Sequence, residues 1–179
     1  MKKTIIIYII FLTIIPTISH SHRESDFRWY LNKRFNFKIY LPASKKWKTF
    51  EQKLKKEYQL ILNREKNTSI TIRVLAFKGS PKSSNSWLKW YNNEVLKGTT
   101  RILEEKKDKN IKNSDSRLFL VEYKNDGVPI LMRSMLTKIN KYLIVIEARA
   151  CFNQFYKYKN IFDSVMGSFQ VLQEFYHKR

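Results

Sequence analysis

Three apolar runs between Arg117 and Ala150 constrain the fold more than any other part of this 179-residue chain. They are rich in leucine, isoleucine, valine and aromatic residues, and they are separated by Asn125-Asp126-Gly127 and by Asn140-Lys141. Asp-Gly between two apolar runs is a strong signal for a short β-hairpin, because both residues tolerate positive φ angles. The sequence therefore predicts a three-stranded antiparallel meander.

The last of these runs predicts a strand with one apolar face and one face that becomes polar. Side chains of a strand alternate between faces, so one face carries Tyr142, Ile144, Ile146, Ala148 and Ala150, while Leu143, Val145, Glu147 and Arg149 share the other. We expect Glu147 and Arg149 to pair with each other or with neighbours such as Arg133 and Glu122. A structural ion pair is favoured over a catalytic carboxylate, because ion networks often mimic perturbed active-site groups.

A helix is predicted to follow this strand and to cover its apolar face. In "NQFYKYKNIFDSVMGSFQVL" the residues Phe155, Tyr158, Phe162, Val165 and Phe169 recur at spacings of three and four. That spacing places them in one stripe of a helix, which we expect to pack on the sheet.

The sequence before these runs predicts a strand, a hairpin, a helix and a further strand. "FNFKIYLPASKKWKTFEQ" indicates one strand and a turn, and Tyr58–Leu62 with Ile70–Phe77 indicates a hairpin. Trp87, Leu88, Tyr91 and Val95 have helical spacing, and "TRILEEK" after them is a strand candidate.

The first 21 residues have the order of a secretory signal peptide: Lys2 and Lys3, an apolar run from Ile5 to Ile15, Pro16, and then small polar residues. The run is shorter than the ~20 residues that span a bilayer as a helix, so a cleaved leader is favoured over a retained anchor. Candidate cleavage sites follow Ser19 and Ser21. We expect an exported protein, periplasmic or secreted, in which residues 22–179 form one domain.

Residue types that carry catalysis are scarce. His20, His22 and His177 are the only histidines and lie near the chain ends, and the four glycines form no phosphate-binding loop. We expect Cys151, the only cysteine, to be a buried small hydrophobic residue rather than a reactive thiol. The sequence predicts no enzyme and no cofactor, and an enzyme using Glu147 or Cys151 is the remaining alternative.

One conditional metal site depends on the leader. Cleavage after Ser19 would leave His20-Ser21-His22 at a free amine, an arrangement that chelates Cu(II) or Ni(II), whereas cleavage after Ser21 destroys it. No metal site is therefore assigned.

The chain is strongly basic, with a formal net charge of +20. Lysines concentrate around Trp47 and Phe50 and suggest a patch for anionic lipid headgroups or phosphorylated glycans, with these two aromatic residues available for stacking or insertion. The candidate anion-binding residues are Lys45, Lys46, Trp47, Lys48, Lys53, Lys55 and Lys56. The alternative is generic solvated surface, because specific phosphate sites use arginine forks while lysine gives a diffuse field. The export signal makes nucleic acid an unfavoured partner.

The order of elements resembles the PsbP-like family, named for an extrinsic subunit of the oxygen-evolving photosystem. The resemblance covers roughly Phe35 to Leu172 and rests on "FNFKIYLPASKKWK", the hairpin "YQLILNR...SITIRVLAF", the helix after it, and the close "YLIVIEARACFNQFYKYKNIFDSVMGSFQVL". It implies an α+β fold, an α/β/α sandwich around a central and mainly antiparallel sheet. It also implies use as a non-enzymatic assembly, scaffold or ligand-binding module. The core has no histidine to serve as a ligand, so no metal site is carried over.

Two hypotheses about function follow. The first is an exported, non-catalytic envelope protein that acts as an accessory, scaffold or binding module for another protein or complex. The second is a binder of anionic surfaces through the lysine-rich patch, whose binding would weaken steeply with salt.

Overall fold

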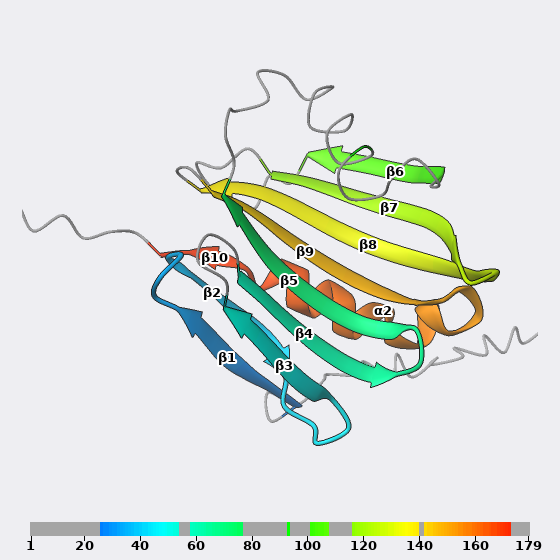
Figure 1. The fold of residues 1–179 in the computed structure, drawn as a ribbon, viewed down its shortest axis with the longest axis horizontal. Coiled ribbons are helices and arrows are strands. Elements are labelled where there is room, and N and C mark those ends of the chain that lie inside the picture. Colours follow the sequence, from blue (N-terminus) through cyan, green and yellow to red (C-terminus); the bar gives the residue numbers. More distant parts are fainter. Residues whose placement is uncertain are drawn as a thin grey trace, which may run out of the picture.

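The part of the chain that the structure describes forms two antiparallel sheets and one helix (Figure 1). The computed structural model describes residues 26–53, 58–76, 93, 101–107, 116–139 and 142–172. Within these residues the strands are β1 (Phe27–Asn32), β2 (Phe37–Pro42), β3 (Lys48–Lys53), β4 (Tyr58–Glu65), β5 (Thr68–Ala76), β6 (Arg101–Lys107), β7 (Ser116–Asn125), β8 (Val128–Ile139), β9 (Tyr142–Cys151) and β10 (Gln170–Val171), and the helix is α2 (Phe152–Gly167).

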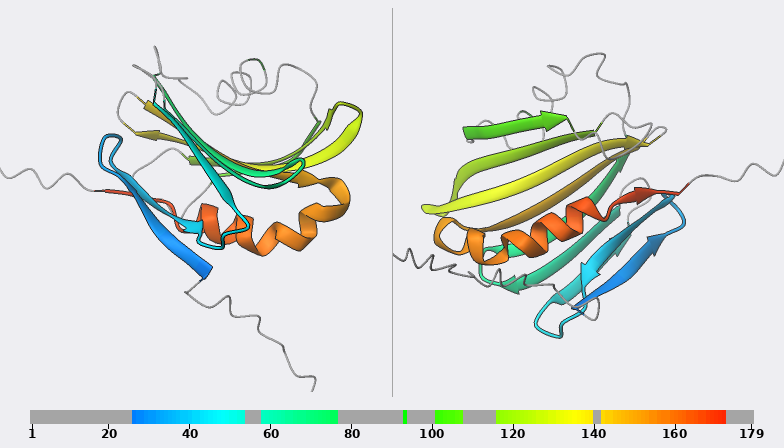
Figure 2. Two further views of the ribbon diagram at one scale, coloured as in Figure 1. Left: turned by 60° about the horizontal axis from the view of Figure 1, so that its bottom comes forward. Right: turned by 180° about the vertical axis from the view of Figure 1, so that it is seen from behind.

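The larger sheet has seven strands in the order β3-β4-β5-β9-β8-β7-β6, and every neighbouring pair is antiparallel. The smaller sheet has the order β1-β2-β10. Figure 2 shows that the smaller sheet and α2 lie on the same side of the larger one. The expected meander is confirmed as β7-β8-β9, and the expected hairpin is confirmed as β4-β5.

Turn residues in left-handed backbone conformations close both of these hairpins. Asp126 and Gly127 have φ angles of 50° and 78° and connect β7 to β8. Asn67, with φ of 64°, is in the turn between β4 and β5. Asparagine, aspartate and glycine tolerate this region at low cost, so these residues fix the register of the strands beside them.

Sequence patterns missed the strands β1, β3 and β10 and misplaced one helix end. β1 and β3 lie where only a turn or no element was expected, and all six residues of β3 are exposed at an edge of the large sheet. An edge strand without a buried face has no period-2 signal in its sequence. α2 ends at Gly167, so Phe169 lies beyond the helix, although its side chain is still buried in the core.

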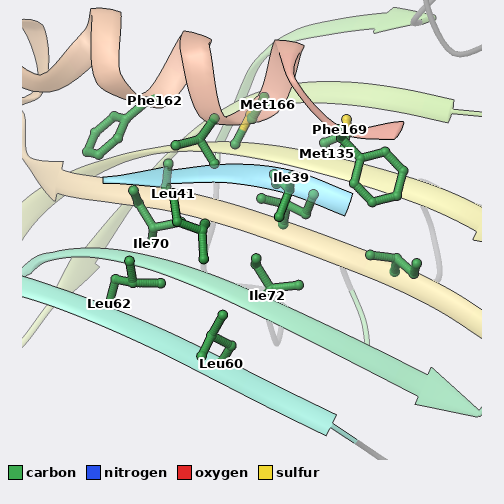
Figure 3. Close-up of a cluster of buried hydrophobic side chains, with 14 of the residues drawn as sticks. Ile39, Leu41, Leu60, Leu62, Ile70, Ile72, Met135, Phe162, Met166 and Phe169 are labelled. Atoms are coloured by element: carbon green, nitrogen blue, oxygen red, sulfur yellow. The ribbon is translucent and has the colours of Figure 1, made fainter. Parts of the chain in front are cut away.

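The main core lies between the large sheet on one side and α2 with β2 on the other (Figure 3). Phe162 and Met166 enter it from α2, and Ile39 and Leu41 enter it from β2. The apolar face expected for β9 is confirmed, because Ile144, Ile146, Ala148 and Ala150 belong to this core. The expected α+β class is therefore confirmed. Among the described residues, α2 forms the helical layer on one face of the large sheet.

The helix expected around Trp87–Val95 lies outside the described residues, as do Asn140-Lys141 and the expected leader. Among the residues that the structure describes, no helix is both long enough and apolar enough to cross a lipid bilayer.

Candidate functional site

Glu147 forms an ion pair across the sheet, on the face opposite α2. Arg73 of β5 donates from Nη2 to Glu147 Oε1 at 2.7 Å. The expectation of a structural ion pair matches this geometry, but the expected partners were wrong. Arg149 does not pair with Glu147, and Arg133 forms its ion pair with Asp163 of α2 on the opposite face of the sheet.

Arg149 is held by neutral groups. Its Nε donates to Ser69 Oγ at 3.0 Å, and its Nη1 donates to the Tyr123 hydroxyl at 3.2 Å. Within the described part of the chain Arg149 has no carboxylate partner. The half-buried guanidinium is thus fixed in orientation by neutral groups, and no carboxylate of the described residues forms an ion pair with it.

Strand register places Arg149 at the end of the polar part of one row of paired residues, which continues into β8 with the apolar Met132. Lys48 lies opposite Asn63, Asn63 opposite Ser69, and Ser69 opposite Arg149. The row crosses β3, β4, β5 and β9, and its residues line a pocket of about 430 Å³. The turn of the β4-β5 hairpin completes the lining with Arg64, Glu65, Lys66, Asn67 and Thr68. We call this the hairpin pocket.

The expected lysine patch is divided by the length of β3. Lys45 and Lys46 lie in the turn before β3 and Lys48 begins the strand, whereas Lys53 ends it. At about 3.4 Å per residue, the ends of a six-residue strand are about 17 Å apart. Lys55 and Lys56 lie outside the described residues.

Trp47 is not available for stacking on a ligand. Only 7% of its surface is exposed, and its ring lies 6.2 Å, centroid to centroid, from the ring of Tyr158 on α2. The expectation of an available aromatic residue is therefore corrected for Trp47, a core residue that anchors the turn carrying Lys45 and Lys46, whereas Phe50 of β3 is 56% exposed. This anchor holds the two lysines at the same end of the sheet as Arg64 and Lys66, because Tyr158 also donates a hydrogen bond to Glu65 at 2.6 Å.

Cys151 is half-buried rather than buried, which corrects a second expectation. It precedes the first residue of α2 and lines a shallow pocket with Lys66, Val128 and Gln154 among others. The described residues contain no group of three or more histidine, cysteine, aspartate or glutamate side chains that could hold a metal ion. His20, His22 and His177 lie outside the described residues.

The outer face of the small sheet exposes large apolar side chains. Trp29 and Leu31 of β1 are 44% and 48% exposed, and the register places Trp29 opposite Tyr40 of β2. The two rings have centroids 3.6 Å apart, and Lys38 Nζ lies 4.6 Å from the centroid of the Trp29 ring. We call Trp29, Leu31, Lys38 and Tyr40 the aromatic face.

A tyrosine pair joins the two sheets at the opposite end of β3. The hydroxyl groups of Tyr30 and Tyr58 are hydrogen-bonded to each other, and Tyr30 also donates to Glu51 at 3.4 Å. Burial raises the pKa of Tyr58 well above its ordinary value of 10.0, and the neighbouring Tyr30 raises it further. Burial likewise raises the pKa of Tyr30.

No protein-family model matches the chain, and no curated protein matches it in sequence. Solved structures do match its fold. The solution structure of cyanobacterial PsbP from Synechocystis sp. PCC 6803 superposes with a TM-score of 0.61 at 13% identity, covering 82% of this chain and 93% of that one.

A second match is the crystal structure of PA94 from Pseudomonas aeruginosa, described as a protein of unknown function and putative regulator. Its TM-score is 0.51 at 11% identity, with 79% of this chain and 94% of that chain covered. Identities this low establish a shared fold and nothing about activity. The expected family resemblance is thereby confirmed for the architecture, and the chain has a PsbP-like fold.

Proposed function

We propose that the protein is an exported, non-catalytic accessory module that binds another protein of the cell envelope. The aromatic face carries this proposal. Tryptophan and tyrosine are the residue types most often found at the energetic centre of protein interfaces. Here they stand together on a paired β-ribbon, with Leu31 beside them, and roughly half of Trp29 and of Leu31 is open to solvent.

The aromatic face has the properties of a preformed interface. Its strands are fixed by six consecutive residue pairs between β1 and β2, and the inner side chains of β2 are anchored in the main core. Binding would therefore cost little ordering of the backbone. Burying the exposed parts of Trp29 and Leu31 would be favourable, because apolar surface leaves water. Such an interface resists salt.

The test compares capture of a partner by the wild-type chain and by variants. The exported protein is used as bait in native envelope extract, and bound proteins are washed at low and then at high salt. We expect one partner to survive the high-salt wash with wild type and to be lost with Trp29→Ser combined with Leu31→Ser.

The matched control is Tyr156→Ser on α2, because Tyr156 is 67% exposed and lies on a different surface. The control should retain the partner. A partner retained equally by all three baits would contradict the assignment to this face, and so would release of every bound protein at high salt.

A second candidate function is binding of anionic surfaces, and the clustering of cations at one end of the large sheet favours it. Lys45, Lys46 and Lys48 lie there together with Arg64 and Lys66. No ion-pair partner stands beside these five among the described residues. Unbalanced positive charge attracts anionic vesicles over a Debye length of about 8 Å at physiological salt.

Sedimentation with phosphatidylglycerol vesicles at increasing salt tests this candidate. We expect Lys45→Gln with Lys46→Gln to weaken vesicle binding. Lys33→Gln with Lys53→Gln removes the same charge elsewhere, since Lys53 ends β3 and Lys33 lies in the turn between β1 and β2, and should weaken binding less. Equal losses from both pairs would indicate that only net charge matters.

A further inference from the structure

We infer that the hairpin pocket is a discrete binding site for a phosphate monoester, with Arg149 as its central ligand-binding residue. This inference rests on the second candidate function and deepens it, because it replaces a diffuse lysine surface with a defined site. The site contains two arginines that the lysine pattern of the sequence did not indicate, Arg64 and Arg149.

The first argument is the state of Arg149. Two neutral acceptors, Ser69 Oγ and the Tyr123 hydroxyl, bind its Nε and Nη1 and so fix the plane of the guanidinium. Its Nη2 group has no hydrogen-bond partner among the described residues. An oriented guanidinium with a spare donor is prepared for an anion, since its geometry requires little further ordering on binding.

Arg73, on the same face of the same sheet, shows the contrast. Its Nη2 is occupied by Glu147 at 2.7 Å, so its charge is balanced within the fold. The two arginines lie on neighbouring strands, because Arg73 is in β5 and Arg149 in β9. One arginine of this face therefore serves the structure, and the other retains binding capacity.

The second argument is the convergence of charge on one pocket. Arg149 and Lys48 lie at opposite ends of the polar part of the row, about 14 Å apart between Cα atoms at about 4.8 Å per strand spacing. Asn63 and Ser69 lie between them and offer neutral polar groups, while Arg64 and Lys66 add two charges from the hairpin turn. Both long cationic side chains can therefore reach one ligand from either side.

The only acidic residue of the pocket lining is engaged elsewhere. Glu65 accepts a hydrogen bond from the Tyr158 hydroxyl at 2.6 Å, which directs its carboxylate toward α2. Four cations thus surround a volume of about 430 Å³ with one carboxylate turned aside. Sites of roughly 300–1,000 Å³ hold small organic ligands, so a phosphate group fits together with the sugar or glycerol that carries it.

A phosphate monoester matches this set of donors better than a carboxylate or a diester. It carries up to two negative charges and three terminal oxygens, so it can accept from Arg149 and from the other cations at once. The monoester could belong to a soluble metabolite or to a lipid headgroup, and both share the chemistry that the pocket recognises.

The experiment is a titration of the folded, exported chain labelled with ¹⁵N in arginine. Glycerol phosphate is added at constant ionic strength, and the Nε–H signal of Arg149 is followed by NMR. We expect a saturable shift of this signal in the wild-type protein, with little change at Arg73. Arg149→Lys should weaken binding about tenfold, because a lysine keeps the charge but loses the fork. Arg73→Lys is the matched control and should leave affinity unchanged.

A second arm identifies the source of the monoester. Phosphatidylcholine vesicles containing phosphatidic acid present the monoester on a lipid, and vesicles containing phosphatidylglycerol present a diester. Retention by phosphatidic acid at a salt concentration that releases phosphatidylglycerol supports a lipid source. Saturation by glycerol phosphate without such retention supports a soluble one.

The inference is overturned if glycerol phosphate leaves the Arg149 signal unchanged and phosphatidic acid shows no advantage. The wild-type signal decides this even if Arg149→Lys does not fold. If phosphatidylglycerol vesicles still bind in a salt-dependent way in that case, binding of anionic surfaces by the clustered cations would remain supported without a defined phosphate site. If no vesicles bind at any salt concentration, both the phosphate monoester site and the anionic-surface function would be contradicted.

Discussion

Glu147 is a buried carboxylate, 8% exposed, whose negative charge is balanced by Arg73. Replacing it with glutamine keeps the shape and removes the charge, which leaves the Arg73 guanidinium without its counter-ion. We expect Glu147→Gln to lower the free energy of unfolding by about 1–3 kcal/mol, the usual cost of a weakened charged hydrogen bond away from bulk water. Urea denaturation monitored by circular dichroism measures this change.

An exposed ion pair provides the comparison for Glu147. Lys159 donates to Asp163 at 2.6 Å on α2, but its side chain is 43% exposed. Lys159→Ala should cost at most about 0.5 kcal/mol, because water screens such pairs. If both substitutions had equally small effects, the Arg73–Glu147 pair would not stabilise the fold. That result would favour the alternative in which Glu147 has a functional role.

Tyr58 makes stability depend on pH in the alkaline range. Burial raises the pKa of Tyr58 in the folded state above its ordinary value of 10.0, so the unfolded state loses its proton first. Stability is complete below pH 10 and falls as pH rises above it, by about 1.4 kcal/mol per pH unit for one such group. Urea midpoints at a series of alkaline pH values should decline for this reason.

Tyr58→Phe removes the titrating group and should give a shallower alkaline decline, although its stability near neutral pH is lower because Tyr30 loses a hydrogen-bond partner. The two proteins differ only at this position, so the difference between the two curves reports Tyr58 together with its effect on the neighbouring Tyr30. Parallel curves would mean that Tyr58 ionises normally in the folded protein.

Sequence could predict the face of a side chain but not its partner across the sheet. Alternation along β9 correctly put Glu147 and Arg149 together on the face opposite the helix. Arg73 and Ser69 bind them from β5, and Tyr123 binds Arg149 from β7. β5 is separated from β9 by more than sixty residues, and no sequence pattern states which strands become neighbours. The hairpin pocket could not be predicted from the sequence for the same reason, because its row of residues comes from four strands whose order in the sheet no sequence pattern states.

Helix α2 is held to the large sheet by a stripe of aromatic and aliphatic side chains. Phe162 has no exposed surface and packs between Phe155 and Tyr158 of the same helix and the sheet below. Phe162→Ala should lower the free energy of unfolding by roughly 3–5 kcal/mol, because it leaves a cavity in the main core. Chemical denaturation checks the value.

Tyr156→Ala removes another aromatic residue from the same helix, but that side chain is 67% exposed. Its effect should stay within about 0.5 kcal/mol, as for most surface substitutions. A large loss at Tyr156 combined with a small loss at Phe162 would mean that the buried face of α2 is misassigned.

Elements with a buried face were predictable, and elements without one were not. α2 and the strands of the meander carry clear apolar patterns, because α2 buries one stripe while β8 and β9 are buried over most of their length. β3 buries no residue, and its sequence KTFEQK resembles a polar loop. Trp47 was misread for a related reason: its lysine neighbours suggested a surface, whereas tertiary packing against Tyr158 draws the indole into the core.

The two sheets share one core, and this determines how the protein should unfold. Phe37, Ile39 and Leu41 of the small sheet contact the same apolar cluster as Leu60 and Ile72 of the large sheet and Phe162 of α2. Neither sheet buries its inner face without the other. Removing the small sheet would expose the core side of β4 and β5, so its separate unfolding is costly.

We therefore expect residues 22–179 to unfold in a single cooperative transition. Trp47 lies where the turn after β2 meets α2, so its fluorescence reports on the junction, while far-ultraviolet circular dichroism reports mainly on the strands. The two signals should give the same urea midpoint, as they do in two-state unfolding. A variant with Trp29→Phe, Trp87→Phe and Trp90→Phe keeps Trp47 as its only tryptophan, so its fluorescence reports on Trp47 alone. An earlier transition by fluorescence than by circular dichroism would show that the small sheet detaches first, and the aromatic face would then be carried by a separately unfolding unit rather than by a rigid one.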